Sequence, residues 1–353
     1  MNLKINRPEP IVSDVDLILF KKRTEVISTI KQLVDGYYVL ITGTYSNGID
    51  LIHEVHKYLK IEFAKDSFKE QRNFRAEFQK ISKQILIEIV DHKLKVKKSP
   101  EIGWLEKLYP EQDRFLLPFT QIQGLNSAWQ WYIKGINLPV LRNKIHPYYG
   151  VYFPTRFEHL ILFDNWLKRY EGSKKSAFDI GVGCGVLSLQ MVKHGFQKVF
   201  ATDTNSNAIF GLNEAIEGTK NGRKIELEHA NLFGSREKPS ELIVFNPPWL
   251  PTSTKLGRLD EAIYYPKGLF PEFFEEAKKR LTSEGKLVVL FSNLAQITEV
   301  TKEHPIEKEL AKGNRFKLNS KFTKSVKSAS SKTTRDQNWR AEETIELWVL
   351  EHI

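Results

Sequence analysis

The fold is predicted mainly from one segment, Ser176-Ala-Phe-Asp-Ile-Gly-Val-Gly-Cys-Gly-Val-Leu-Ser188. Its first five residues have the composition of a buried strand, three glycines follow at alternate positions, and an apolar helical pattern continues through Leu189, Met191 and Val192. Such glycines let the backbone turn tightly and approach a ligand closely, while the amino end of a helix offers N–H groups to a polar or anionic partner. The stretch therefore predicts a strand, a glycine loop and a helix.

An acidic residue follows at the spacing that a nucleoside site requires. The strand predicted at Lys198–Thr202 ends at Asp203, twenty residues past Gly183. A carboxylate at this place is the expected partner of ribose hydroxyls. A glycine loop by itself is as often an ordinary turn, so the prediction depends on the motifs occurring together.

The third motif is Asn246-Pro-Pro-Trp249, which follows an apolar run at Glu241–Phe245. Prolines lack an N–H and have fixed φ, so this turn leaves carbonyl groups unpaired, and the Asn246 amide adds another acceptor. Strands of an open α/β sheet bind ligands at their carboxyl ends, where this cluster is expected to lie. It suits a planar N–H donor, although a stiff turn without function is the alternative for an isolated Pro-Pro.

Together the three motifs resemble the class I S-adenosylmethionine-dependent methyltransferases, in particular the branch whose catalytic loop is Asn/Asp-Pro-Pro-Tyr/Phe/Trp. That branch includes adenine-N6, guanine-N2 and release-factor glutamine-N5 methyltransferases. The resemblance runs from about Tyr148 to the carboxyl end, and Tyr149-Gly-Val-Tyr-Phe-Pro-Thr155 is similar to the segment before the cofactor loop in glutamine-N5 enzymes. It does not cover the first 145 or so residues.

The resemblance implies an α/β fold with a Rossmann-like seven-stranded sheet, S-adenosyl-L-methionine as cofactor, and a role for each matching residue. The methionine part of the cofactor would lie beside Asp179, Gly181, Gly183 and Gly185, the ribose at Asp203, and the adenine at Asn231 and Leu232. The catalytic loop would be Asn246, Pro247, Pro248 and Trp249. The family often has Asp where this chain has Asn231, whose carbonyl can still accept from the adenine amino group.

A nicotinamide dinucleotide is the rival cofactor, because Gly183-Cys-Gly-Val-Leu-Ser188 differs by one residue from the dinucleotide fingerprint. The Asn-Pro-Pro-Trp loop argues against it. So does the end of the chain, where strands predicted at Gly285–Ser292, Asn314–Leu318 and Thr344–Leu350 fit a seven-stranded sheet with an antiparallel final hairpin.

Length predicts a second domain. The chain has 353 residues, 41% of them apolar, which is enough for two cores. We expect a mostly helical accessory or substrate-recognition domain at residues 1–145 and the methyltransferase domain at 146–353. The helices expected in the first domain run from Ser13 to near Gly36, Asp50 to Ala64, Ser67 to Ile89 and Asn126 to Lys134.

Within that first domain, two sets of side chains have both a functional and a structural interpretation. Trp129, Trp131 and Tyr132 could stack on a substrate, but aromatic residues at this spacing belong more often to a core. His53 and His56 lie three apart without acidic or histidine partners, so no metal site is predicted.

The chain has one cysteine, Cys184, which excludes an intrachain disulfide and is expected to be a small buried residue. The amino end has no signal-peptide pattern and no apolar run approaches ~20 residues, so a cytoplasmic protein without a membrane segment is expected.

The net charge is +10, and Lys308 to Arg335 contains nine Lys or Arg residues and one acid, Glu309. One interpretation is a phosphate-contacting arm for RNA or DNA. The alternatives are a solvated insertion, since Ser325–Thr334 is poor in apolar residues, and a surface for an acidic protein.

No Cys nucleophile, Ser-His-Asp set or carboxylate pair is apparent, so direct transfer of the methyl group to a planar amide or amine nitrogen is the predicted chemistry. The resemblance around Gly150–Pro154 favours a protein glutamine or similar side chain as the acceptor, and the basic segment favours RNA. A small-molecule or peptide natural-product acceptor and a non-catalytic cofactor-binding scaffold are the other hypotheses, and the oligomeric state stays open.

Overall fold

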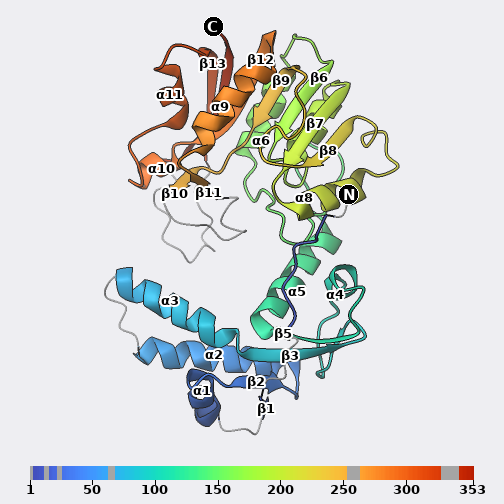
Figure 1. Cartoon of the computed structure of the whole chain (residues 1–353), viewed down its shortest axis with the longest axis vertical. Helices are drawn as coiled ribbons and strands as arrows, with labels where there is room; N and C mark the ends of the chain where they lie inside the picture. Colours follow the sequence, from blue (N-terminus) through green and yellow to red (C-terminus); the bar gives the residue numbers. More distant parts are fainter. Residues whose placement is uncertain (1–2, 12–15, 22–25, 63–67, 253–262, 327–341) are drawn as a thin grey trace. The chain divides into compact units, whose positions relative to one another are not determined.

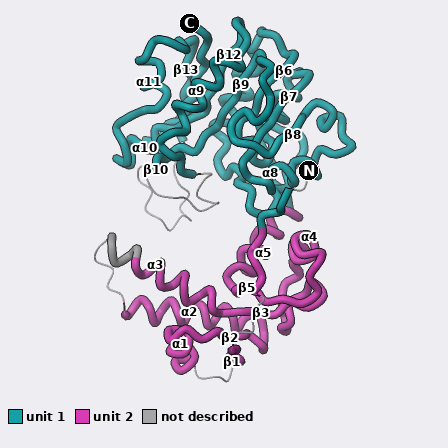
Figure 2. The backbone as a smooth tube through the Cα atoms, viewed as in Figure 1, with its two compact units in different colours: residues 1–6, 134–353 teal, residues 7–133 magenta. Residues whose placement is uncertain are grey.

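Two compact units make up the chain (Figure 2). The computed structural model describes residues 3–11, 16–21, 26–62, 68–252, 263–326 and 342–353 (Figure 1). Unit 1 consists of Met1–Asn6 and Lys134–Ile353, and unit 2 of Arg7–Ile133. The boundary expected between residues 145 and 146 therefore lies inside unit 1, which also takes in the first residues of the chain.

Unit 1 is built on a seven-stranded sheet in the order β13-β14-β12-β9-β6-β7-β8. The five strands from β12 to β8 are parallel, and β14 is antiparallel to both of its neighbours. The strands are β6 (Ser176–Ile180), β7 (Lys198–Asp203), β8 (Ile225–His229), β9 (Ser240–Phe245), β12 (Leu281–Ser292), β13 (Phe316–Ser325) and β14 (Thr344–His352). This confirms the Rossmann-like sheet and its antiparallel final hairpin.

Both faces of this sheet are covered, because successive residues of a strand point to opposite sides. Ala177 and Val244 lie in the apolar core on one face, and Phe178 and Phe245 lie in the core on the other. The first core includes α6 (Glu158–Leu167), α7 (Val186–Lys193) and α8 (Ser206–Ile216), and the second includes α9 (Leu269–Arg280) and α11 (Pro305–Leu310). Figure 1 shows this three-layer arrangement.

Short elements follow the carboxyl ends of β9 and β12. Strand β10 (Leu250–Thr252) comes directly after the Asn-Pro-Pro-Trp turn and pairs parallel with β11 (Tyr264–Pro266). The four-residue helix α10 (Leu294–Ile297) comes directly after β12. They lengthen the connections on the side of the sheet where the motifs converge.

Unit 2 contains a five-stranded sheet in which β1, β2 and β3 are parallel, and β3 also pairs antiparallel with β4 and β5. Its strands are β1 (Leu17–Phe20), β2 (Tyr38–Ile41), β3 (Ile85–Val90), β4 (Lys93–Leu94) and β5 (Arg114–Pro118). Its helices are α1 (Val26–Val34), α2 (Tyr45–Glu62), α3 (Phe68–Ser82), α4 (Trp104–Leu108) and α5 (Phe119–Lys134). The sheet was not predicted.

Two stretches expected to be helical in unit 2 form strands instead. Leu17–Phe20, placed in the first helix, is β1, and Ile85–Val90, placed at the end of the third, is the central strand β3. A short continuous apolar run fits either structure by periodicity alone, and here pairing with β2 decides. The expected helix starts at Ser13 and Ser67 lie outside the described residues.

The aromatic residues of α5 divide between core and surface. Trp129 and Tyr132 are half-buried and pack with the fully buried Trp104, with ring centroids 5.5 and 4.7 Å away. Trp131 is exposed. His56 packs edge-on against two phenylalanines of α3, Phe74 and Phe78.

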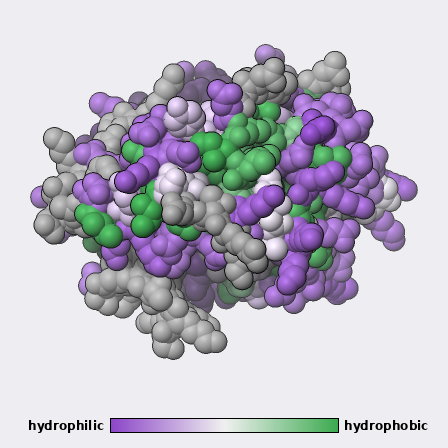
Figure 3. All heavy atoms as spheres, turned by 90° about the horizontal axis from the view of Figure 1, so that it is seen from below, coloured by the Kyte–Doolittle hydropathy of each residue, from purple (hydrophilic) through white to green (hydrophobic). Residues whose placement is uncertain are grey.

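Unit 2 also exposes large apolar side chains on and beside β1 and α1, namely Leu19, Ile27, Val34 and Tyr37. A space-filling view shows apolar residues gathered on part of the face that it presents, with polar residues around them (Figure 3). None of the helices in the described part of the chain has the length and apolar character needed to cross a membrane.

Candidate active site

Three predicted motifs meet in one row at the carboxyl edge of the unit 1 sheet. Ile180 on β6 lies opposite Thr202 on β7 and Phe245 on β9. The next residues along the three neighbouring strands are therefore Gly181, Asp203 and Asn246. Residues 22 and 65 positions away from Gly181 in the sequence thus end at one place, which is where open α/β sheets bind ligands.

The glycine loop needs glycine for its backbone shape. Gly181, Gly183 and Gly185 have φ angles of 69°, 51° and 80°, a region that other residues adopt only with strain. At Gly185 a Cβ would also lie 2.4 Å from Leu212 Cδ1 on α8. The missing side chain lets α7 begin against α8, so the loop leads directly into a helix amino end.

Asp203 fastens the glycine loop to the end of β7. Its Oδ2 accepts a hydrogen bond from the Gly183 N–H at 2.8 Å, and its Oδ1 accepts one from the Asn205 N–H at 2.8 Å. Each carboxylate oxygen has a further acceptor position. The residue predicted to bind ribose hydroxyls is thus held in place by backbone donors and keeps the capacity to accept from a diol.

Asp179, the other predicted acid, is fully buried at the end of β6. Its Oδ2 accepts from Ser188 Oγ on α7 at 2.5 Å, whereas no hydrogen-bond partner is found for Oδ1 among the described residues. Burial raises the pKa of this carboxyl to about 7, although the bond from Ser188 acts in the opposite direction. A buried acceptor with spare capacity is a feature that a cationic or N–H-bearing ligand would complete.

The Asn-Pro-Pro-Trp turn forms a small polar assembly of its own. Pro247 is buried, and the other three residues are half-buried. The Trp249 indole N–H lies 3.3 Å from Asn246 Oδ1, a long hydrogen bond that holds the ring beside the amide. An amide oxygen has two lone pairs, so Asn246 can still accept from a bound group. The catalytic roles of these four residues stay predictions.

His159 stands against this turn and was missed in the sequence. It lies in the first turn of α6 with 7% of its surface exposed, and its ring is 5.9 Å from the Trp249 ring at an interplanar angle of 87°. Burial lowers the pKa of the imidazole to about 4, so the ring is neutral at pH 7. Within the part of the chain that the structure describes, Nδ1 has no hydrogen-bond partner.

The segment Tyr149–Phe157, which we call the cover segment, is tied to both sides of this edge. At one end Asn207 Nδ2 donates to the Tyr149 carbonyl at 2.7 Å, and Asn205 Nδ2 donates to the Gly150 carbonyl at 2.9 Å. Between these ends, a Cβ on Gly183 would lie 3.7 Å from the Tyr152 carbonyl oxygen. The segment similar to glutamine-N5 enzymes thus runs beside the glycine loop.

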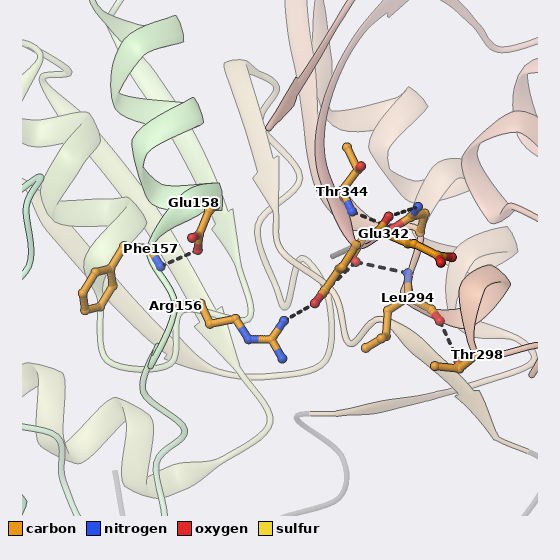
Figure 4. Close-up of polar contacts among 10 residues, drawn as sticks. Arg156, Phe157, Glu158, Leu294, Thr298, Glu342 and Thr344 are labelled. Atoms are coloured by element: carbon orange, nitrogen blue, oxygen red, sulfur yellow. Dashed lines mark hydrogen bonds and ion pairs between the residues drawn. The ribbon is translucent and has the colours of Figure 1, made fainter. Parts of the chain in front are cut away.

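At its other end the cover segment is held by an ion pair. Arg156 pairs with Glu343, whose side chain is fully buried and also accepts from Ser292 Oγ at 3.1 Å. Figure 4 shows Arg156 pointing toward the turn that contains Glu342 and Thr344, at the start of β14. Removing one partner of a buried pair is costly, so this contact fixes the segment across the edge of the sheet.

The two residues predicted beside the adenine have other contacts. Asn231 is exposed, and its Nδ2 lies 3.5 Å from Glu272 Oε1 on α9. Leu232 is buried with φ at 45°, and its carbonyl accepts from Thr202 Oγ1. Leu232 therefore shapes the loop after β8, while the role of Asn231 stays a prediction.

Cys184 in the glycine loop has the properties of a structural residue. Burial raises the pKa of its thiol to about 12, so no thiolate forms near neutral pH. Among the described residues no group of three or more His, Cys, Asp or Glu is arranged to hold a metal ion. The groups available at this edge are acceptors, N–H donors and aromatic rings.

The basic segment is largely neutralised within unit 1. Of its residues from Lys308 to Lys324, five form ion pairs: Lys308 with Glu303, Lys312 and Arg315 with Glu309, Lys317 with Glu351, and Lys321 with Glu346. For Lys324 no ion pair is found among the described residues, and the other three basic residues, at 327, 332 and 335, lie outside them. The described part therefore presents less unbalanced charge than the sequence suggested.

Known proteins resemble this unit. Residues 160–323 match the family model described as the methyltransferase small domain. A protein of Methanocaldococcus jannaschii named as a candidate protein N5-glutamine methyltransferase is 34% identical over 122 residues, 34% of this chain and 55% of that protein. A ribosomal protein L11 methyltransferase of Alkaliphilus metalliredigens is 34% identical over 80 residues, 23% of this chain and 25% of that protein. The chain thus spans about half, or less, of the length of these curated relatives.

Among solved structures, the ribosomal protein L11 methylase of Lactobacillus delbrueckii subsp. bulgaricus has a TM-score of 0.40 and 18% identity, over 62% of this chain and 91% of that chain.

Proposed function

We propose that unit 1, a methyltransferase domain by the family model that it matches, transfers a methyl group from S-adenosyl-L-methionine to a planar carboxamide nitrogen of a protein. The observation that carries this proposal is the row formed by Gly181, Asp203 and Asn246 at the ends of three adjacent strands. A cofactor-type loop, a carboxylate for a diol and an acceptor for an N–H group lie side by side there.

The residues present fit the proposed cofactor. The Asp203 oxygens suit ribose hydroxyls, Gly181 and Gly183 have no side chain that would block close approach, and the unsatisfied Asp179 Oδ1 suits a cationic or N–H group. When bound, S-adenosyl-L-methionine supplies a methyl group made electrophilic by its sulfonium. A nicotinamide dinucleotide accounts for the loop but not for the Asn-Pro-Pro-Trp turn.

The chain's own groups would promote attack by a poor nucleophile because they orient it. The lone pair of an amide nitrogen is delocalised into the carbonyl, so its attack needs orientation more than a strong base. Asn246 Oδ1 and the Pro247 carbonyl would accept its N–H groups, and Trp249 would stack on its plane. Orientation of this kind can lower a barrier by ~7 to 11 kcal/mol in well-aligned cases. The nitrogen gains the methyl group, and its proton leaves to solvent afterwards.

Two observations favour a protein acceptor. The relative of Methanocaldococcus jannaschii is named for protein N5-glutamine methylation, and its matched stretch is 34% identical. The cover segment, which resembles glutamine-N5 enzymes, runs beside the glycine loop. RNA is the second candidate, because the chain carries a net charge of +10, but five of the six described basic residues between Lys308 and Lys324 are already paired.

The test is to incubate the purified chain with methyl-labelled S-adenosyl-L-methionine and a lysate of cells that lack it. Protein, nucleic acid and small molecules are then separated and counted. Label in the protein fraction, recovered as methylglutamine after digestion, supports the proposal. Label in RNA or in small molecules would replace the acceptor class, and no label with demonstrated cofactor binding would favour a non-catalytic scaffold.

A further inference from the structure

His159 is a buried polar residue beside the Asn-Pro-Pro-Trp turn, and the mechanism above does not use it. Its ring lies 5.9 Å from the Trp249 ring at 87°, and Trp249 in turn donates to Asn246. His159 is therefore in contact with the aromatic residue that would stack on the acceptor. It reaches this place from α6, far from the loop in the sequence.

The hydrogen bonding of His159 is incomplete. Nδ1 is buried and has no partner among the described residues, although buried polar atoms are nearly always bonded. Other histidines of unit 1 are bonded: His304 Nε2 lies 3.0 Å from Glu346, and His194 Nε2 lies 2.8 Å from Asp164. An imidazole left incomplete at one position, beside the proposed acceptor site, is best explained by a bond that a ligand supplies.

The chemistry of the acceptor indicates which bond this is. Asn246 Oδ1 and the Pro247 carbonyl are acceptors, so they can hold only the N–H side of a planar amide. The other side of a carboxamide is a carbonyl oxygen, which needs a donor. A neutral imidazole has one N–H, and it can carry that hydrogen on Nδ1.

We propose that His159 is a specificity residue of the acceptor site. Its Nδ1–H donates to the carbonyl oxygen of the carboxamide whose nitrogen is methylated. This inference rests on the proposed function and sharpens it. It predicts preference for acceptors with such an atom over aliphatic amines, which have none. Because Nδ1 carries the hydrogen that it donates, this nitrogen does not act as the base.

Three variants distinguish the contribution of the Nδ1 atom of His159 from that of its ring. His159→Phe keeps an aromatic ring against Trp249 and removes Nδ1. His159→Asn removes the ring but places an amide N–H near the position of Nδ1. His304→Phe is the matched control, since His304 is about equally buried but bonded within the β13–β14 hairpin region.

The measurement is the initial rate against the concentration of the label-accepting protein fraction, with S-adenosyl-L-methionine affinity determined by calorimetry. We expect His159→Phe to raise the half-saturating acceptor concentration about tenfold or more, as for a lost bond to a buried polar atom, with cofactor affinity unchanged. His159→Asn should recover part of this loss. His304→Phe should lower thermal stability and leave acceptor saturation as in the wild type.

An unchanged half-saturating concentration in His159→Phe would overturn the inference, as would equal losses of acceptor and cofactor binding in the Phe and Asn variants, which indicate a packing role. A wild-type chain that labels no fraction would instead refute the proposed function. The two failures are thus distinguishable.

Discussion

Two buried carboxylates in unit 1 differ in how completely they are bonded. Glu346, in the β13–β14 hairpin, accepts from His304, Lys321 and Trp348 at 3.0, 2.8 and 2.8 Å. Burial alone would raise its pKa, but these donors outweigh it and lower the pKa to about 2. Asp179, beside the glycine loop, has one side-chain donor and an unpartnered oxygen, and burial raises its pKa to about 7.

The difference separates a carboxylate whose hydrogen bonding is complete within the chain from one that leaves an acceptor position unused. A buried charge is tolerated when donors surround it, and an incompletely bonded one costs free energy in the absence of a ligand. Asp179 and His159 each have a buried polar atom without a partner among the described residues, and both lie near the row of Gly181, Asp203 and Asn246. Substitutions in the hairpin should therefore affect stability, and substitutions in the row should affect ligand binding or turnover.

The largest effect expected is that of Asn246→Ala on turnover. It removes an acceptor that positions the nitrogen, so turnover should fall by about two to four orders of magnitude, part of the orientation effect. Initial rates with labelled cofactor measure this, and S-adenosyl-L-methionine affinity and thermal stability should change little.

Asn246→Asp is the matched control, because it keeps a carbonyl-type acceptor at the same position. It should retain more turnover than Asn246→Ala. If Asn246→Ala lost cofactor affinity and turnover equally, the loop would be structural and the contrast with the hairpin would fail.

Glu346→Ala should show the opposite pattern. It leaves the buried His304 ring and the Trp348 N–H without their acceptor, so we expect unfolding to need about 3 kcal/mol less free energy. Urea denaturation measures this loss, and cofactor affinity of the folded variant should match the wild type. Glu346→Gln, which keeps one oxygen acceptor, should lose less. A Glu346→Ala variant as stable as the wild type would show that these bonds contribute nothing.

Asp179→Asn tests the other carboxylate through pH. In the folded chain the pKa of Asp179 is raised from about 3.8 to about 7, so the protonated carboxyl stabilises the folded wild type. This stabilisation is complete below pH 4 and is lost as the pH rises to 7. The variant has no such loss, so its melting temperature should rise relative to that of the wild type between pH 4 and pH 7. Its cofactor binding should be weaker. A melting difference independent of pH would mean that the Asp179 oxygen is bonded after all.

The sequence was sufficient for the central strands of the unit 1 sheet, because local signals mark where they end. Asp203 ends β7 and Asn246 follows β9 at the predicted positions. At the edge, β13 runs from Phe316 to Ser325, whereas the strand was predicted at Asn314–Leu318. The sheet of unit 2 was missed because Leu17–Phe20 and Ile85–Val90 acquire their structure from pairing with β2, which a local pattern does not encode.

The same reasoning explains the missed site residues. His159 meets Trp249, and Asn207 meets Tyr149, only after folding. No motif marks a single His or Asn, so these contacts had no signal in one sequence. Residues that shape a local backbone turn, such as the glycines, are predictable, whereas residues that act through a long-range contact are not.

The smallest effects should come from the lysines of β13, and they test whether pairing matters for a polyanion. Lys317 pairs with Glu351 at 3.4 Å, whereas no ion pair is found for Lys324 among the described residues. Exposed pairs contribute ~0 to 1 kcal/mol, so Lys317→Gln and Lys324→Gln should each alter the unfolding free energy only slightly. If unit 1 contacts RNA, Lys324→Gln should weaken binding of a single-stranded RNA at low salt more than Lys317→Gln, because the carboxylate of Glu351 already opposes the charge of Lys317. Equal losses of RNA affinity in the two variants would show that local pairing does not suppress phosphate contact. The basic segment would then again support an RNA acceptor.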